Sequence, residues 1–170
     1  MMFLCVAITA TVDSLLGQEP QAVTAGVTVQ YLDDAPQQVS LEDIKKLPET
    51  KLTVKDRDGK EVVYTGVYLH DFLDLTPAPL GESLRGAGLG LFLLAEAKDG
   101  YRVLFSLPEV DPEFSDRRVL LAYAKNGQPL EANDGPLRLV VPADKRPARW
   151  IRMLTKLYIL DGIAMAKKVK

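Results

Sequence analysis

Four residues near the C-terminal end have types and spacing that suit ligand binding: Arg138, Arg149, Trp150 and Arg152. Trp150 is the only tryptophan of the chain. An indole face beside guanidinium donors suits a planar heterocycle, because the ring stacks while the N–H groups donate to carbonyl or phosphate oxygens. The alternative is structural, with Trp150 in the core and the arginines at sheet edges. The residue types alone leave both interpretations open.

The position of Arg138 in the sequence gives a second reason to expect a charged partner. It stands in GPLRLVV, at the start of an apolar strand. An unpaired cation is costly in such a place, so Arg138 is expected to have an acidic neighbour or to bind an anion. The loop 131–136, which contains the turn sequence NDG, delivers it there.

Other chemistry has weaker support. His70 is the only histidine, so a histidine-based metal site or a Ser-His-Asp triad would depend on it alone. We expect His70 on the exposed side of a short helix or in a core hydrogen bond, with direct ligand contact as the alternative. The glycine-rich stretch 86–90 precedes a strand and opens no expected helix, so it is interpreted as a plain loop and not a phosphate site.

Composition limits the class of protein. The chain has 170 residues and a formal charge of −2, which fits one domain and argues against a nucleic-acid binder. Basic residues gather late in the sequence: none precedes Lys45, and residues 145–170 are locally basic. This basic end could serve a small anion, and the lysines of 167–170 are expected to be a solvated tail.

The N-terminal segment predicts export. Residues 1–10 are apolar but too few to span a bilayer, which takes ~20 apolar residues. We interpret residues 1–20 as a signal peptide and 21–170 as one domain, located in the periplasm or secreted, without a membrane span in the mature chain. No basic residue precedes the apolar run, so a misplaced start or a buried first strand is the alternative. The only cysteine, Cys5, lies in this segment.

The remaining patterns predict an α+β domain, mostly antiparallel or mixed β-sheet with short helices. Asn126-Gly127 is expected to form a tight turn within a broad hairpin. A last strand over 149–160 would place Trp150 and Arg152 on one face and Arg149 on the other. The other expected elements are strands 23–32, 51–55, 61–65, 91–97, 101–107, 119–124 and 137–141 and short helices 40–48 and 69–75.

Several short motifs carry a resemblance to a known family. LLAY, NGQPL, GPLRLVVP and ARWIRML follow one another between residues 120 and 154. In order and spacing they resemble the molybdopterin-binding domain of the sulfite oxidase family. The similarity extends more loosely to YTGVYLHDFLDL at 64–75 and DGYRVLFSL at 99–107, which together make about two thirds of the chain.

The resemblance implies site residues. Arg138 and Arg149 match basic positions around the pyranopterin and its phosphate, and Tyr101 matches a tyrosine near the metal. The enzymes hold molybdenum through a cysteine on an early strand, whereas the matching stretch here, KLTVKDR at 51–57, has none. We therefore expect no molybdenum and no catalytic residues.

The resulting hypothesis is a pterin receptor. The chain is similar to the small exported members of this superfamily, which implies a periplasmic pterin-binding protein that reports to a membrane-bound signalling partner. Trp150, Arg149, Arg138, Tyr101 and His70 are the candidate ligand-binding residues. Two alternatives stay open: a molybdopterin-dependent oxidoreductase with a non-cysteine attachment, and a scaffold that keeps the fold and binds another protein.

Overall fold

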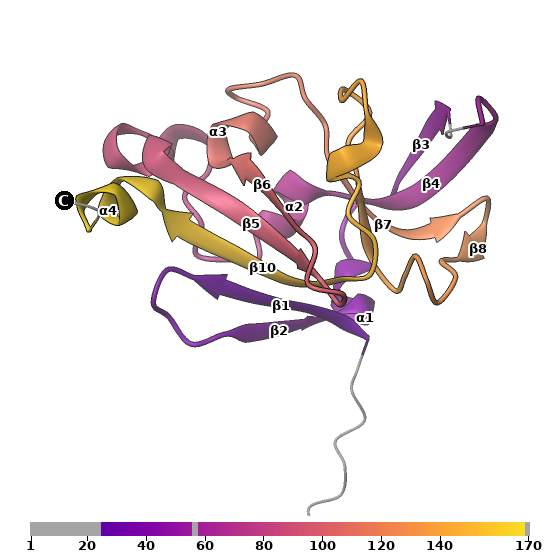
Figure 1. Ribbon diagram of the computed structural model, residues 1–170, viewed down its shortest axis with the longest axis horizontal. Coiled ribbons are helices and arrows are strands. Elements are labelled where there is room, and N and C mark those ends of the chain that lie inside the picture. Colours follow the sequence, from indigo (N-terminus) through magenta and orange to yellow (C-terminus); the bar gives the residue numbers. More distant parts are fainter. Residues whose placement is uncertain (1–24, 56–57, 169–170) are drawn as a thin grey trace, which may run out of the picture.

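Two β-sheets form the body of the protein (Figure 1). A computed structural model of the chain describes residues 25–55 and 58–168. The first sheet has the strand order β2-β1-β10-β5-β6. Its β1–β10 pair is parallel and its other pairs are antiparallel, so the sheet is mixed. Its strands are β1 (Gly26–Tyr31), β2 (Gln37–Ser40), β5 (Leu91–Ala97), β6 (Arg102–Ser106) and β10 (Leu154–Asp161).

The second sheet contains the hairpin expected from the sequence. Its order is β3-β4-β7-β8, and β9 pairs with β7 beyond the end of β8. Asn126 and Gly127 have φ values of 50° and 77°, as the tight turn between β7 and β8 requires. The strands are β3 (Thr50–Lys55), β4 (Glu61–Tyr68), β7 (Leu120–Lys125), β8 (Gln128–Pro129) and β9 (Arg138–Val140).

The helices are short, and side chains cap several of them. Ser40 accepts a hydrogen bond from the Asp43 backbone N–H, which confirms the expected helix start. Among the described residues, no helix is long and apolar enough to cross a membrane. The α-helices are α1 (Leu41–Ile44), α2 (Leu69–Leu73), α3 (Leu107–Val110) and α4 (Gly162–Lys167), and the 3-10 helices are η1 (Gly81–Ser83), η2 (Gly86–Gly90) and η3 (Pro147–Arg149).

One large hydrophobic cluster joins the two sheets. It includes Leu93 of β5, Leu157 of β10 and Leu121 of β7, each fully buried, and Phe72 of α2 packs into it. A smaller cluster around Tyr64 and Val140 lies on the second sheet, and Trp150 touches both clusters. The α+β class with mixed and antiparallel sheets is thus confirmed.

Two local predictions were wrong. The last strand begins at Leu154 and not at residue 149, because Pro147 opens η3 and Met153 adopts a left-handed φ of 48° that interrupts an extended chain. The face assignment within 149–153 therefore does not hold. Residues 86–90 form the short helix η2 and not a plain loop. The predicted signal peptide at 1–20 and Cys5 lie outside the described residues.

Candidate functional site

A cleft of about 1030 Å³ opens on the second sheet. Its lining comes from β3, β4, β8, β9 and the end of β7, and from two segments that follow β8 and β9, at 131–134 and 142–152. Small-molecule pockets usually measure about 300–1000 Å³, so the volume suits a ligand with a fused ring system. Trp150, Arg138 and Arg152, which the sequence had singled out, all line it.

Trp150 and Tyr64 form an aromatic corner in this cleft. Their ring centroids lie 6.4 Å apart at an interplanar angle of 85°, an edge-to-face arrangement. The Trp150 indole Nε1 donates a hydrogen bond of 2.8 Å to the Val141 carbonyl oxygen, which fixes the ring. The indole is half-buried and lines the cleft, so part of its surface is open to a ligand.

Arg138 has the acidic neighbour expected from its place at the start of a strand. Its Nη1 donates to both carboxylate oxygens of Asp134, at 2.6 and 2.7 Å, and to the Tyr64 hydroxyl at 3.0 Å. The guanidinium carbon lies 4.8 Å from the centroid of the Tyr64 ring, within cation–π range. Arg138 is only 8% exposed, and its buried Nε has no hydrogen-bond partner. A buried donor without an acceptor costs free energy. The Arg138 Nη2 makes no hydrogen bond to the described residues and is not fully buried, so it is the donor available to a ligand acceptor.

The described lining of the cleft has a formal excess of two positive charges. Its basic residues are Lys55, Lys125, Arg138, Lys145 and Arg152, and its acidic residues are Glu131, Asp134 and Asp144. Two of the three carboxylates, Asp134 and Asp144, are bound to arginines. The remaining charge favours a ligand that carries an anionic group.

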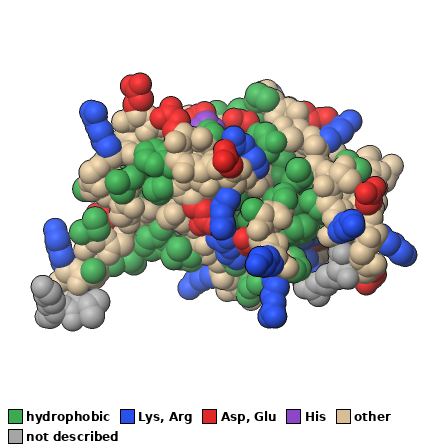
Figure 2. All heavy atoms as spheres, turned by 90° about the horizontal axis from the view of Figure 1, so that it is seen from above, with side chains coloured by type: hydrophobic (Ala, Val, Ile, Leu, Met, Phe, Trp, Pro, Cys, Tyr) green, Lys and Arg blue, Asp and Glu red, His purple; other side chains and the backbone are tan. Residues whose placement is uncertain are grey.

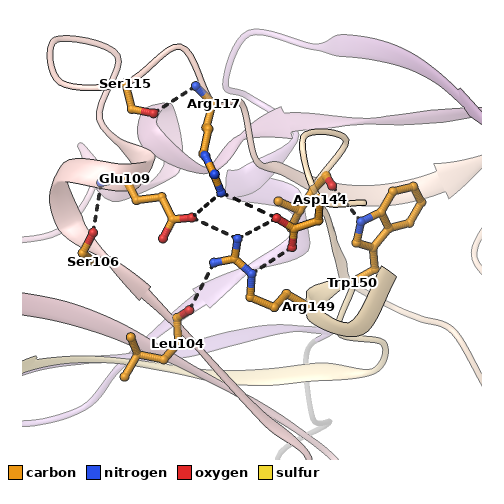
Figure 3. A network of polar contacts seen from close by, with 9 residues as sticks. Leu104, Ser106, Glu109, Ser115, Arg117, Asp144, Arg149 and Trp150 are labelled. Carbon is orange, nitrogen blue, oxygen red and sulfur yellow. Dashed lines mark hydrogen bonds and ion pairs between the residues drawn. The ribbon is translucent and has the colours of Figure 1, made fainter. Parts of the chain in front are cut away.

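Arg149 does not line the cleft, because its guanidinium lies within an ion-pair network (Figure 3). Its Nε and Nη2 donate to Asp144 at 2.8 and 2.6 Å, and Nη2 donates to Glu109 at 2.9 Å. The carboxylates of Asp144 and Glu109 raise the pKa of Arg149 above its ordinary value. Arg117 joins the network through the same two acids. Figure 3 shows the Arg149 guanidinium between Glu109 and Asp144, with the neighbouring Trp150 indole turned away from it.

Tyr101 and His70 also lie apart from the cleft lining. The Tyr101 hydroxyl donates to the Ala148 carbonyl oxygen at 2.8 Å, and the side chain is half exposed. His70 lines a separate, smaller pocket together with Asp71 and Arg118. Figure 2 shows the histidine among acidic side chains, consistent with a cluster of His70, Asp71 and Asp74. Ligand contacts of Arg149, Tyr101 and His70 stay predictions from the family resemblance.

Sequence reasoning missed three residues that line the cleft, Tyr64, Lys55 and Asp134. Tyr64 is buried within β4 and Lys55 ends β3, so nothing local distinguishes them from ordinary strand residues. Asp134 had a usable signal: it precedes Arg138 by four residues, in a loop that returns the chain to the sheet. The expectation of an acidic neighbour for Arg138 pointed to it without naming it.

The fold and the site define an α+β domain of two sheets with an aromatic and cationic cleft on the second sheet. The sequence profile of the oxidoreductase molybdopterin binding domain matches residues 18–166. The chain therefore belongs to this family. No protein with a curated function matches the sequence.

A solved structure has a similar fold. Sulfane dehydrogenase SoxCD from Paracoccus pantotrophus matches with a TM-score of 0.59 and 22% sequence identity over 81% of this chain. The present chain spans 38% of that longer chain. At this level of identity the similarity shows the fold alone.

The cleft fits the organic part of a molybdopterin better than its metal. The indole face and the cationic lining are suited to a flat ring with an anionic substituent. Molybdenum in this family calls for a soft sulfur ligand, as the resemblance implied. The described residues that line the cleft include neither cysteine nor histidine.

Proposed function

We propose that this chain binds a pterin in the cleft and catalyses no redox reaction. The observation that carries the proposal is the pairing of a fixed, half-open Trp150 indole with the buried Arg138 guanidinium in one cleft. Stacking on one aromatic face contributes about 1–3 kcal/mol. A few hydrogen bonds raise the total toward the roughly 8 kcal/mol of micromolar affinity.

The residues that line the cleft support the binding of a pterin whose metal is not held by a protein side chain. In the family resemblance, β3 corresponds to the strand that holds the molybdenum-ligating cysteine. This strand does line the cleft here, but with Thr53, Val54 and Lys55. A lysine supplies a positive charge for an anionic substituent and no thiolate for a metal.

The family match also favours a second candidate, a molybdopterin-dependent oxidoreductase with another mode of metal attachment. Metal and cofactor analysis of protein purified from its natural host separates the two functions. We expect substoichiometric molybdenum. About one molybdenum per chain would support the enzyme and contradict the receptor.

We further propose that the protein is a periplasmic receptor that passes the ligand signal to a membrane-bound partner. The support is the apolar segment at residues 1–10 and the resemblance to small exported pterin-binding proteins. Cell fractionation tests the location. Cross-linking in the presence and absence of pterin tests the partner, and we expect a pterin-dependent membrane-protein adduct. Cytosolic protein, or no such adduct, would contradict this part.

Substitutions in the cleft test the binding site. We expect Trp150→Ala and Arg138→Ala each to weaken pterin affinity at least about tenfold, equivalent to roughly 1.4 kcal/mol. Matched controls outside the described cleft lining are Phe114→Ala, an exposed aromatic residue, and Arg146→Ala, an exposed arginine. Isothermal titration calorimetry measures the affinities, and thermal unfolding checks each fold. Unchanged affinity in both cleft variants would place the pocket elsewhere.

A further inference from the structure

Asp134 and Arg138 form a nearly buried acid–base pair in the wall of the cleft. Their side chains are 15% and 10% exposed, and both residues line the cleft. The Asp134 backbone is also fixed, because its carbonyl oxygen accepts a hydrogen bond of 3.0 Å from the Met153 N–H. The pair therefore presents acceptor and donor atoms in a defined place.

Asp134 retains unused acceptor capacity. Each of its carboxylate oxygens accepts one hydrogen bond from Arg138 Nη1. An ionised carboxylate offers about four lone-pair sites, so about half of its capacity is left for ligand N–H groups. A buried carboxylate is stabilised by each further donor that reaches it.

Arg138 retains unused donor capacity. Its hydrogen bonds to Asp134 and Tyr64 all leave from Nη1, whereas the buried Nε has no acceptor. A guanidinium has five N–H donors in a fixed plane. Nη2 makes no hydrogen bond to the described residues and is not fully buried, so Nη2, and not the enclosed Nε, is the donor available to a ligand oxygen beside the pair.

The free acceptor sites of Asp134 and the free donor of Arg138 together match the hydrogen-bonding edge of a 2-amino-4-oxopyrimidine ring. A 2-amino-4-oxopyrimidine ring presents two adjacent donors, the 2-amino group and N3–H, followed by an acceptor, the 4-oxo oxygen. A carboxylate next to a guanidinium offers the opposite pattern. The pair is also neutral overall, which suits an uncharged ring edge, while the excess cations of the cleft suit an anionic substituent.

We infer that Asp134, together with Arg138, selects ligands by their 2-amino-4-oxopyrimidine edge. This inference rests on the proposed function and names the specificity residue of its cleft. Asp134 accepts from the 2-amino and N3–H groups, and Arg138 donates to the 4-oxo oxygen. A ring with an oxo group at position 2 would place that oxygen against the Asp134 carboxylate. Both are hydrogen-bond acceptors, so such a ring is rejected.

A different role for Asp134 makes the opposite prediction. If its carboxylate only neutralised Arg138 until an anion displaced it, then removing the charge of Asp134 would strengthen anion binding. It would also leave the preference between two uncharged rings unchanged. The comparison of two ring types therefore separates selection from charge competition.

The experiment compares pterin (2-amino-4-oxopteridine) with lumazine (2,4-dioxopteridine) by calorimetric titration of wild type, Asp134→Asn and Asp116→Asn. Asp116 is the matched control, because it is an exposed aspartate outside the described lining of the cleft. We expect wild type and Asp116→Asn to prefer pterin by at least about tenfold. Asp134→Asn should lose at least about tenfold in pterin affinity and most of the preference, since its amide can donate to the 2-oxo oxygen of lumazine.

The outcomes separate this inference from the function on which it rests. Failure of wild type to bind either ring would overturn the proposed function and the inference together. Equal binding of pterin and lumazine by wild type would overturn the inference alone, and this ratio is measurable whether or not the variant folds. An unchanged ratio in folded Asp134→Asn, or the same loss in Asp116→Asn, would also overturn it.

Discussion

Arg149→Ala tests the distinction between the two arginines that flank Trp150. The structure assigns Arg149 to an ion-pair network that joins the segment after β9 to α3. Its guanidinium also stacks on Phe105, 4.7 Å from the ring centroid. Truncation to alanine removes these contacts and leaves Asp144 and Glu109 with Arg117 as the remaining cation of the network. We therefore expect Arg149→Ala to destabilise the fold.

The size of the effect follows from burial and geometry. Breaking a fully buried ion pair by removing one partner costs about 3–5 kcal/mol. The Arg149 side chain is 25% exposed and the two carboxylates are 13% and 21% exposed. Partial solvation and the remaining Arg117 reduce the cost, so we expect a loss of about 2 kcal/mol in unfolding free energy. For a chain of this size the midpoint temperature should fall by roughly 4–8 °C.

Urea unfolding of Arg149→Ala and Arg152→Ala provides the assay. Arg152 is exposed and lines the cleft, so its removal should change stability by less than about 0.5 kcal/mol. Pterin affinity should show the reverse order, with the larger loss in Arg152→Ala. The reasoning is refuted if Arg149→Ala unfolds like wild type, or if only the Arg149 variant loses ligand while it stays fully folded.

Two further predictions concern the fold. Arg102 donates a hydrogen bond to the Glu96 carboxylate, which holds the pKa of Glu96 below its ordinary 4.5. The pair therefore contributes its full stability above pH 4.5. That stability is lost as the pH falls through the lowered pKa of the folded state. The stability difference between wild type and Glu96→Gln, measured by urea unfolding, should therefore shrink below about pH 4.5; a constant difference would contradict this assignment. Gly66→Ala should cost more than about 2 kcal/mol, because a Cβ there meets the Leu121 carbonyl oxygen, whereas Gly88→Ala meets only ordinary contacts. Equal midpoints for the two glycine variants in thermal unfolding would refute the steric argument.

Local signals were sufficient for most of the fold. The Asn126-Gly127 turn, the helix start at Ser40 and the strand at 91–97 each depend on neighbours in sequence, and the structure confirms them. The parallel pairing of β1 with β10 joins residues more than a hundred positions apart. Periodicity gives no register or partner for such a pair, so this contact was beyond sequence reasoning.

The candidate site was less predictable, because its geometry depends on an irregular segment. The alternating pattern over 149–160 suggested a strand, but Pro147 and the left-handed Met153 break it. Arg152 and Trp150 reach the cleft from this segment, whereas Arg149 turns to Asp144. Which arginine lines the cleft depends on those backbone angles and on a distant acid on α3, Glu109, and neither is visible in a strand pattern.

The most direct measurement is a pterin titration followed by the fluorescence of Trp150, the only tryptophan in the chain. We expect saturable quenching with a midpoint in the micromolar range, for a reduced or an oxidised pterin. A Trp150→Phe variant supplies the background signal. If folded protein shows no quenching at tens of micromolar pterin, roughly ten times the expected dissociation constant, pterin binding in this cleft is contradicted.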